Sequence, residues 1–224
     1  MLRTAIKSDL PGMIALWGES FGDSEPAVRF FFESFPDCIS YVAEKNGVIV
    51  SMVHALPQTL SPDVPAAYVY AVATLKTHRG KGLCRDLMAF AEKDLRDRGF
   101  DCCVLTPGEP HLFRFYEKLG YRADFTRTRT AFSGGNAISA AAYTALRKQI
   151  LTVPHMVCDL RTLEYAAKVY GLRFYETPTG IAAAGEDYTA EVLPEDVTGP
   201  PFAMIKWLKE EAPLQNAYLG FPLE

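Results

Sequence analysis

Apolar residues recur every four positions in one segment of the chain, between residues 83 and 98. The recurring residues are Leu83, Leu87, Ala91 and Leu95. This spacing predicts an amphipathic helix that packs its apolar stripe on a sheet. Short runs typical of strands flank it, at residues 66–74 before the helix and 101–106 after it. A strand, a helix and a second strand in this order predict that the two strands pair in parallel.

Further helices and strands are expected on the N-terminal side and just beyond this segment. The pattern predicts strands at 2–6, 39–43, 48–56 and 121–132, and helices at 10–19, 25–35 and 110–119. Asn46-Gly47 is a strong hairpin signal, so the N-terminal half should be antiparallel. Asp9 is expected to cap the first helix. The predicted fold class is therefore α/β, with a mixed α+β sheet of about six strands and helices on both faces.

A glycine-rich break at residues 134–136 divides the chain, and we predict domains at 1–133 and 137–224. Beyond the break we expect helices at 138–150, 160–170 and 202–211, strands at 179–184 and 188–193 joined as a hairpin, and a closing strand at 217–223. This order resembles the start of the chain, so a truncated second copy of the first domain is one interpretation of the C-terminal α+β subdomain. The apolar periodicity of the subdomain predicts that it is folded.

Composition excludes several classes of protein. The chain has 224 residues, 49% of them hydrophobic and 22% charged, which is typical of a globular protein. A formal net charge of -4 argues against nucleic-acid binding. The apolar stretches are far shorter than the ~20 residues that span a membrane, and the N-terminus does not read as a signal peptide. We expect a cytoplasmic protein with reduced cysteines and no metal site, since no cysteine or histidine cluster has ligand spacing.

Residues 78–83, reading HRGKGL, stand where the strand at 66–74 gives way to the helix. Gly80 and Gly82 have no Cβ, so the backbone N–H groups there can approach an anion. The first N–H groups of a helix have no intrahelical partner, and the helix dipole adds positive potential. Basic side chains surround the turn at Lys76, His78, Arg79, Lys81 and Arg85. The turn is therefore a predicted phosphate site.

Two familiar phosphate motifs do not fit this turn. A P-loop requires Ser or Thr after the Gly-Lys pair, whereas Leu83 follows Gly82 and no glycine lies five residues before Gly82. A dinucleotide fingerprint requires a third glycine, and Arg85 occupies that position. The remaining pattern is R-x-x-G-x-G/A.

This pattern resembles motif A of the GNAT acyltransferases. Arg79 and Gly82 match its first two fixed positions, and Cys84 departs from the third, which is usually Gly or Ala. Residues 3–9 are similar to the family's first strand and helix start, and residues 115–121, FYEKLGY, resemble its F-Y-x-K-x-G-F/Y signature. The resemblance covers roughly residues 1–132.

The resemblance implies a GNAT-like acyl-CoA N-acyltransferase fold with acetyl-CoA as cosubstrate and no metal. In the family, motif A binds the coenzyme pyrophosphate. The corresponding residues here are Arg79, Gly80, Lys81, Gly82, Leu83, Cys84 and Arg85. The pantetheine arm would pair with the backbone of the preceding strand at Val72, Ala73 and Thr74. A backbone N–H at that place can also stabilise the oxyanion of the reaction.

Two residues are candidates for catalysis. Tyr116 matches the family position whose hydroxyl approaches the coenzyme sulfur, which suits a general acid, although a purely packing role stays open. Glu109 is a candidate base or a partner for a cationic amine, and it fits equally an acid at a helix start. The lone histidines His54 and His111 are expected to be structural, and an ordinary solvated face explains Arg127 and Arg129 unless they meet an acidic substrate group.

The resemblance thus implies an N-acetyltransferase that moves an acetyl group from acetyl-CoA to a primary amine of a small molecule or peptide by direct attack. A rival class is an acyl-CoA-binding sensor or regulatory module with weak catalysis. A hydrolase is disfavoured because no nucleophile–base pair is visible. We expect no nucleic-acid or membrane partner. The C-terminal part would cover the acceptor side of the first domain or form a homodimer interface.

Overall fold

The computed structural model describes residues 1–209 and 217–219, and these divide into two compact units. The first unit contains residues 1–58, 64–105 and 206–209. The second contains residues 59–63, 106–205 and 217–219. Neither unit is a continuous stretch of chain, and the domain boundary expected at 134–136 stays a prediction.

The first unit is built on a mixed sheet, as the sequence predicts. Its strands, in sheet order, are β1 (Leu2–Thr4), β2 (Ile39–Lys45), β3 (Val48–Leu60), β4 (Val64–Thr74) and β5 (Cys102–Leu105). β2 pairs antiparallel with both β1 and β3, and β4 pairs in parallel with β5. The β2–β3 hairpin turns at Asn46 and Gly47, whose φ angles of 51° and 77° are those of a tight two-residue turn.

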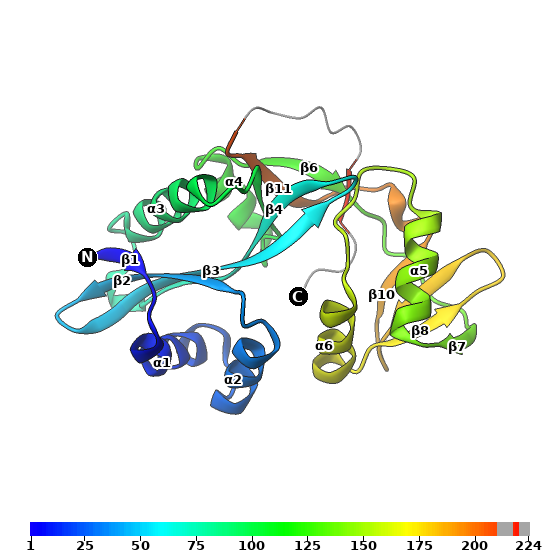
Figure 1. Cartoon of the computed structure of the whole chain (residues 1–224), viewed down its shortest axis with the longest axis horizontal. Coiled ribbons are helices and arrows are strands. Elements are labelled where there is room, and N and C mark those ends of the chain that lie inside the picture. The colour runs from blue at the N-terminus through cyan, green and yellow to red at the C-terminus, as the bar shows by residue number, and fades with distance from the viewer. Residues whose placement is uncertain (210–216, 220–224) are drawn as a thin grey trace. The chain divides into compact units, whose positions relative to one another are not determined.

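Helices cover both faces of this sheet. α1 (Leu10–Phe21) and α2 (Glu25–Ser34) lie on one face, and α3 (Leu83–Asp97) lies on the other (Figure 1). The predicted stripe of α3 is confirmed, because Leu87, Ala91 and Leu95 are at most 2% exposed. Short 3₁₀ turns precede α1 and α3, namely η1 (Lys7–Asp9) and η2 (Lys76–His78).

Asp9 is the N-cap residue of α1, as predicted, but its side chain makes no capping hydrogen bond to that helix. Its carboxylate accepts hydrogen bonds from the Arg3 guanidinium at 2.6 and 2.9 Å and from the Ile6 N–H at 2.8 Å. The side chain is drawn away from the helix because a charged guanidinium is a stronger donor than a backbone N–H. The Arg3 hydrogen bonds also hold the pKa of Asp9 below its usual value.

The second unit begins with α4 (Pro110–Glu117) and β6 (Arg122–Thr126), followed much later by β11 (Pro201–Trp207) and β12 (Ala217–Tyr218). β6 pairs antiparallel with β11 and in parallel with β12. The helix predicted at 202–211 is wrong where the structure describes it, because residues 201–207 form a strand. Ala203, Met204 and Ile205 are all buried, and a short continuous apolar run does not distinguish a core strand from a helix. The predicted strand 217–223 is described only to Leu219.

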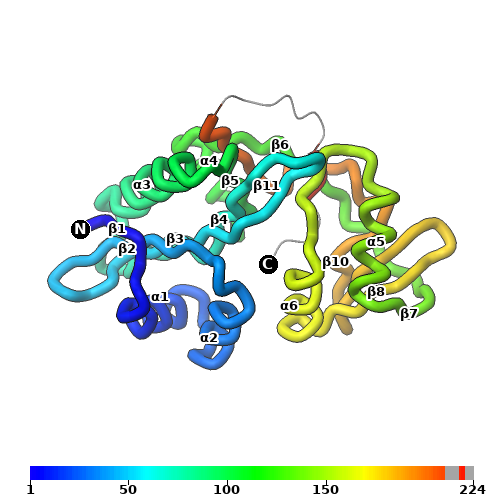
Figure 2. The backbone as a smooth tube through the Cα atoms, in the orientation of Figure 1, coloured from blue at the N-terminus to red at the C-terminus, as the bar shows by residue number. Residues whose placement is uncertain are grey.

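The remainder of the second unit is a four-stranded antiparallel sheet with two helices, which the trace in Figure 2 follows from green to orange. In chain order its elements are β7 (Asn136–Ile138), α5 (Ala140–Ile150), α6 (Leu160–Tyr170), β8 (Arg173–Glu176), β9 (Ile181–Ala184) and β10 (Thr189–Leu193). The hairpin and α6 agree with the prediction. The sequence pattern missed β8 and placed residues 136–138 outside any strand, because both strands are too short to show a period.

The same order of elements occurs twice in the chain. β1–α1–α2–β2–β3–β4, the first module (residues 2–74), matches β7–α5–α6–β8–β9–β10, the second module (residues 136–193). The order of strands also agrees, β1-β2-β3-β4 against β7-β8-β9-β10. The modules differ in the segment after the fourth strand. β4 leads into η2, the glycine turn and α3, whereas β10 leads into Pro194 and the 3₁₀ turn η3 (Glu195–Val197).

A buried polar group lies in the core of the second unit. Glu191 on β10 is fully buried and accepts hydrogen bonds from Tyr143, from Arg147 Nε at 3.0 Å and from Tyr218 at 2.7 Å. We call these four residues the Glu191 cluster. Burial raises the pKa of Glu191, but the charge of Arg147 and the three hydrogen-bonding partners outweigh burial and hold it below its usual value. The carboxylate is therefore ionised and fully paired.

Some features are absent from the part of the chain that the structure describes. Within residues 1–209 and 217–219, every helix is too short or too polar to cross a membrane. In the same ranges no three His, Cys, Asp or Glu side chains gather as a metal site would require. All five cysteines are free thiols.

Candidate functional site

The glycine turn between β4 and α3 has an unusual backbone. Gly80 and Gly82 have φ angles of 73° and 77°, in the left-handed region that residues with a Cβ rarely adopt. A Cβ at Gly82 would lie 2.9 Å from Arg85 Nη2. Both predicted glycines are thus required by conformation, and Gly82 also leaves space directly before the helix.

Backbone donors at the start of α3 are available to a ligand. The Asp86 N–H donates to the Gly82 carbonyl at 3.0 Å and closes the first helical turn. The N–H groups of Leu83, Cys84 and Arg85 precede that bond, so they have no intrahelical acceptor. Gly82 stands at the N-cap and carries no side chain that could accept from them. This arrangement, together with the helix dipole, favours an anion.

Basic side chains around the turn are exposed and are anchored mostly by neutral groups. Arg79 Nε donates to the Thr74 carbonyl at 2.9 Å, and Lys81 Nζ donates to the Thr77 carbonyl at 2.8 Å. A carbonyl holds a cation in place without neutralising its charge. Arg85 differs, because it pairs with Asp86 at 2.9 Å. The turn therefore keeps a positive potential, supplied mainly by Arg79 and Lys81.

Cys84 fills the motif position where the GNAT pattern has Gly or Ala. Its side chain is partly exposed, and burial of the thiol raises its pKa to about 11. The thiol is therefore neutral near pH 7 and adds no negative charge to an anion site. The departure from the pattern is compatible with phosphate binding.

The end of β4 departs from a regular strand. The register between β4 and β5 runs from Ala66 to Tyr68, so Val72, Ala73 and Thr74 lie beyond it. Ala71 has a φ of 46°, which marks a break in the strand directly before these residues. On the other side, Ser51 Oγ donates to the Ala73 carbonyl at 2.8 Å. The sequence gives no sign of the break, because alanine carries no conformational signature for a positive φ.

Tyr116 lies on α4, in the second unit, and is 7% exposed. Its ring packs edge-to-face against Phe115 and Tyr121, with centroids 5.1 and 5.7 Å apart. Its carbonyl accepts the N–H groups of Leu119 and Tyr121, which closes the helix. The packing role is therefore visible, and the role as an acid stays a prediction.

Glu109 immediately precedes α4, and its side chain is 69% exposed. It makes no side-chain cap on the helix, and its carboxylate lies 3.0 Å from His111 Nδ1. A helix-start acid and a base are both compatible with this exposed position. The structure thus brings together the turn and the end of β4 in the first unit, while Tyr116 and Glu109 belong to the second.

His54 is fully buried on β3 and is not a catalytic candidate. Its Nδ1 lies 2.8 Å from Ser40 Oγ, and its ring centroid lies 5.2 Å from that of Trp17 and 5.3 Å from that of Phe32. Burial lowers the pKa of His54 to about 3, so the ring is neutral. The expectation of a structural histidine fits this environment.

The mixed sheet with helices on both faces and the glycine turn before α3 together define the architecture of an acyltransferase of the GNAT type. The chain belongs to the GNAT acetyltransferase family, since the family model for the acetyltransferase (GNAT) domain matches residues 1–123. A search of curated protein sequences found no match.

Solved structures have the same fold. A GCN5-related N-acetyltransferase from Kribbella flavida aligns with a TM-score of 0.66 at 16% identity, over 93% of this chain and 72% of that chain. A probable N-acyltransferase from Enterococcus faecalis V583 aligns with a TM-score of 0.64 at 18% identity, over 82% of this chain. The alignment spans 54% of the Enterococcus chain. A transcriptional regulator from Bacillus halodurans aligns with a TM-score of 0.50 at 25% identity, over 59% of this chain and 99% of that chain.

Proposed function

We propose that this protein is an N-acetyltransferase that moves the acetyl group of acetyl-CoA to a primary amine of a small molecule or peptide. One observation carries the proposal: two left-handed glycines enclose Lys81 directly before α3, in a chain that belongs to the GNAT family. A backbone of this shape exposes its N–H groups to a ligand. Packing of the turn does not by itself require glycine at both Gly80 and Gly82.

The coenzyme would be held mainly by main chain. Its pyrophosphate would accept from the N–H groups at Gly82, Leu83, Cys84 and Arg85, with Arg79 and Lys81 supplying charge. The amides of its pantetheine arm would pair with the backbone at Val72, Ala73 and Thr74, where β4 extends beyond its register with β5. These contacts depend on backbone geometry and so tolerate variation of side chains.

The reaction would be a direct transfer. The amine nitrogen attacks the thioester carbon, the C–N bond forms, and the C–S bond then breaks. A backbone N–H near the end of β4 would stabilise the oxyanion between these events. The departing sulfur takes the hydroxyl proton of Tyr116, and Tyr116 then regains a proton from solvent. The amine gives its proton to Glu109 or to water. The products are an acetamide and free coenzyme A.

A second candidate function is acyl-CoA sensing without efficient transfer. Its support is the exposed position of Glu109, which leaves no strongly activated base, and the likeness to a protein described as a transcriptional regulator. Both candidates share the coenzyme site and differ in turnover.

Coenzyme release from acetyl-CoA, measured with a thiol reagent in the presence of a panel of amines, tests the proposal. The Tyr116→Phe variant should lose about 10²- to 10⁴-fold in turnover while its affinity for coenzyme A is unchanged. Tyr121→Phe is the matched control, since it removes the hydroxyl of another buried tyrosine 5.7 Å away. Coenzyme binding without amine-dependent release would favour the sensor.

A further inference from the structure

Arg127 is a buried arginine in the coil that follows β6. Arg127 is 3% exposed. Its backbone N–H donates to the Pro200 carbonyl at 3.1 Å. Its guanidinium carbon lies 5.0 Å from the ring centroid of Phe202 on β11. The guanidinium therefore lies beside an aromatic ring of the same unit.

Two of the three guanidinium nitrogens of Arg127 have no hydrogen-bond acceptor among the described residues. Nε and Nη1 are both buried, and neither has an acceptor among residues 1–209 and 217–219. Arginine does not lose its proton in proteins, so the charge persists. Burying a cation without a partner costs several kcal/mol, whereas stacking on a ring returns about 0.5–2 kcal/mol. Phe202 alone does not account for the burial of this residue.

The two fully buried carboxylates of the same unit are already used. Glu191 accepts from Tyr143, Arg147 and Tyr218. Asp196 accepts the Thr130 N–H at 2.7 Å and the Val192 N–H at 2.8 Å, one with each oxygen. Neither therefore serves as the partner of Arg127.

A second guanidinium contacts the same ring. The guanidinium carbon of Arg129 lies 5.7 Å from the centroid of Phe202. Phe202 therefore lies beside two arginine side chains, of which Arg127 has the buried nitrogens without acceptors.

From these contacts we infer that Arg127, with Phe202, forms a binding site for the carboxylate group of a small molecule. The planar guanidinium matches a carboxylate in geometry. One carboxylate balances the one buried charge, whereas a phosphate dianion would cost more to desolvate beside Phe202. The low exposure of Arg127 admits only a small group. The site belongs to the second unit and does not depend on the proposed acetyl transfer.

Thermal unfolding with sodium acetate as the probe tests the site. At constant ionic strength, acetate should raise the Tm of the full chain in proportion to the logarithm of its concentration, and neutral acetamide should not. Arg127→Met should raise the Tm without acetate, because it removes an unpaired charge, and should abolish the response to acetate. Arg173→Met is the control, since it removes an exposed arginine on β8 of the same unit and should leave the response intact.

Three outcomes would overturn the inference. Arg127→Met lowering the Tm, with no acetate effect in the wild type, would show that the chain itself supplies the anion. An equal response to chloride, or a response to inorganic phosphate in place of acetate, would remove the carboxylate assignment. If Arg127→Met does not fold, the Nε–H signal of Arg127 in ¹H–¹⁵N NMR spectra of the wild type tests the site instead. That signal should shift saturably with acetate and stay fixed with acetamide, and an unmoved signal would contradict the site.

Discussion

The two modules use the same order of strands and helices but end differently. After β4, the glycine turn leaves the N–H groups at the start of α3 without acceptors. After β10, Pro194 removes one donor and Asp196 accepts two backbone N–H groups with its own carboxylate. In the second module a carboxylate of the chain itself accepts backbone N–H groups, whereas the proposed acceptor at the start of α3 is a ligand. On that proposal the segment after the fourth strand, and not the sheet, determines whether such a module can bind a phosphate.

The modules also differ in the polar groups that they bury. The first buries His54 as a neutral ring among aromatic side chains. The second buries Glu191 as a charged carboxylate paired with Arg147. Neutral burial needs no partner of opposite charge, whereas charged burial requires every member of the cluster. The two cores should therefore respond differently to mutation of these groups.

The largest expected effect is on coenzyme binding in the first module. Gly82→Glu places a side chain and a negative charge where N–H groups would meet the pyrophosphate. Loss of two charge-assisted contacts, each worth about 1.5–3 kcal/mol, should weaken coenzyme A binding by about 10²- to 10⁴-fold. Isothermal titration calorimetry with coenzyme A measures this.

Gly47→Glu is the matched control for that experiment. Gly47 has the same φ of 77° as Gly82, and a Cβ there would meet open space. Glutamate at Gly47 therefore introduces the same backbone strain and the same charge, but far along the chain from the glycine turn. Its affinity should equal that of the wild type. If folded Gly82→Glu binds coenzyme A as tightly as the wild type, the glycine turn is not a phosphate site and the modules do not differ in this respect.

The next effect concerns the stability of the second module. Glu191→Leu leaves Arg147 buried without its partner and should cost about 3–5 kcal/mol, whereas the double variant Glu191→Leu, Arg147→Met should recover much of this. Hydrogen exchange of peptides from 136–193, followed by mass spectrometry, reports on the module directly. A single variant as stable as the double one would show that Glu191 and Arg147 are not coupled.

Mild acid should destabilise the first module through His54. Between pH 6.5 and about 3, the unfolded chain binds a proton on His54 that the folded chain does not. The free energy of unfolding should therefore fall with falling pH, by up to about 1.4 kcal/mol per unit. The lowered pKa of Glu191 means that the ionised carboxylate stabilises the folded chain. This contribution to the free energy of unfolding is fully present above pH 4.5 and is lost only at lower pH.

Urea unfolding between pH 7 and 5 measures the contribution of His54. Both tryptophans of the chain, Trp17 and Trp207, belong to the first unit, so their fluorescence follows it. His54→Gln should have a shallower pH dependence than the wild type, and this difference separates His54 from His155, whose pKa burial also lowers. Parallel pH profiles would contradict the neutral burial of His54.

The smallest expected effect is that of Arg79. Arg79→Ala should weaken coenzyme A binding by about 1–2 kcal/mol, or roughly 5- to 30-fold, because the main chain supplies most contacts. Arg29→Ala on α2 removes another exposed arginine of the same unit and should have no effect. A loss as large as that of Gly82→Glu would mean that side-chain charge, and not the shape of the turn, makes the first module a phosphate site.

Local signals explain why parts of the fold are predictable from sequence. The four-residue spacing of α3, the Asn46-Gly47 turn and the two glycines before α3 each determine structure within a few residues. β8 and β11 were missed or misassigned because their short apolar runs carry no period, and their pairing with distant strands decides their conformation. The side chain of Asp9 differs from the prediction for a local reason, since the nearby Arg3 guanidinium takes its carboxylate.

The candidate site divides in the same way. Residues 79–85 are contiguous, so their motif predicts their geometry. The break at Ala71 has no sequence signal, and Arg127 reads as a residue of a solvated face although it is buried. Tyr116 and Glu109 depend on how distant segments meet, which no local pattern encodes, so their roles in catalysis stay predictions.

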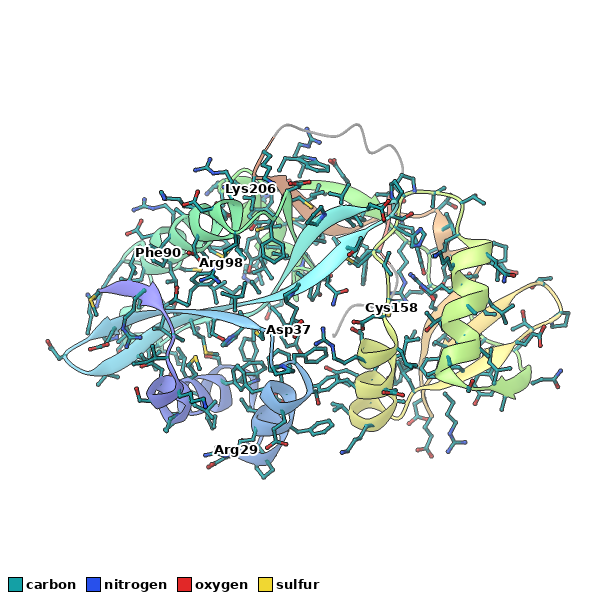
Figure 3. All side chains as sticks on the ribbon, in the orientation of Figure 1. Arg29, Asp37, Phe90, Arg98, Cys158 and Lys206 are labelled. Atoms are coloured by element: carbon teal, nitrogen blue, oxygen red, sulfur yellow. The ribbon has the colours of Figure 1, made fainter. Side chains whose placement is uncertain are left out.

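The path of β11 has a consequence for the synthesis of this protein. β11 begins in the second unit, yet Lys206, labelled in Figure 3, pairs with Glu92 of α3 in the first. Leu208 and Lys209 then bond to Asp101. These residues are synthesised long after α3 and β5, so α3 and β5 lack these partners while the chain between them emerges. The nascent first unit must therefore persist in an unfinished state, and chaperones that retain emerging chains would meet it there.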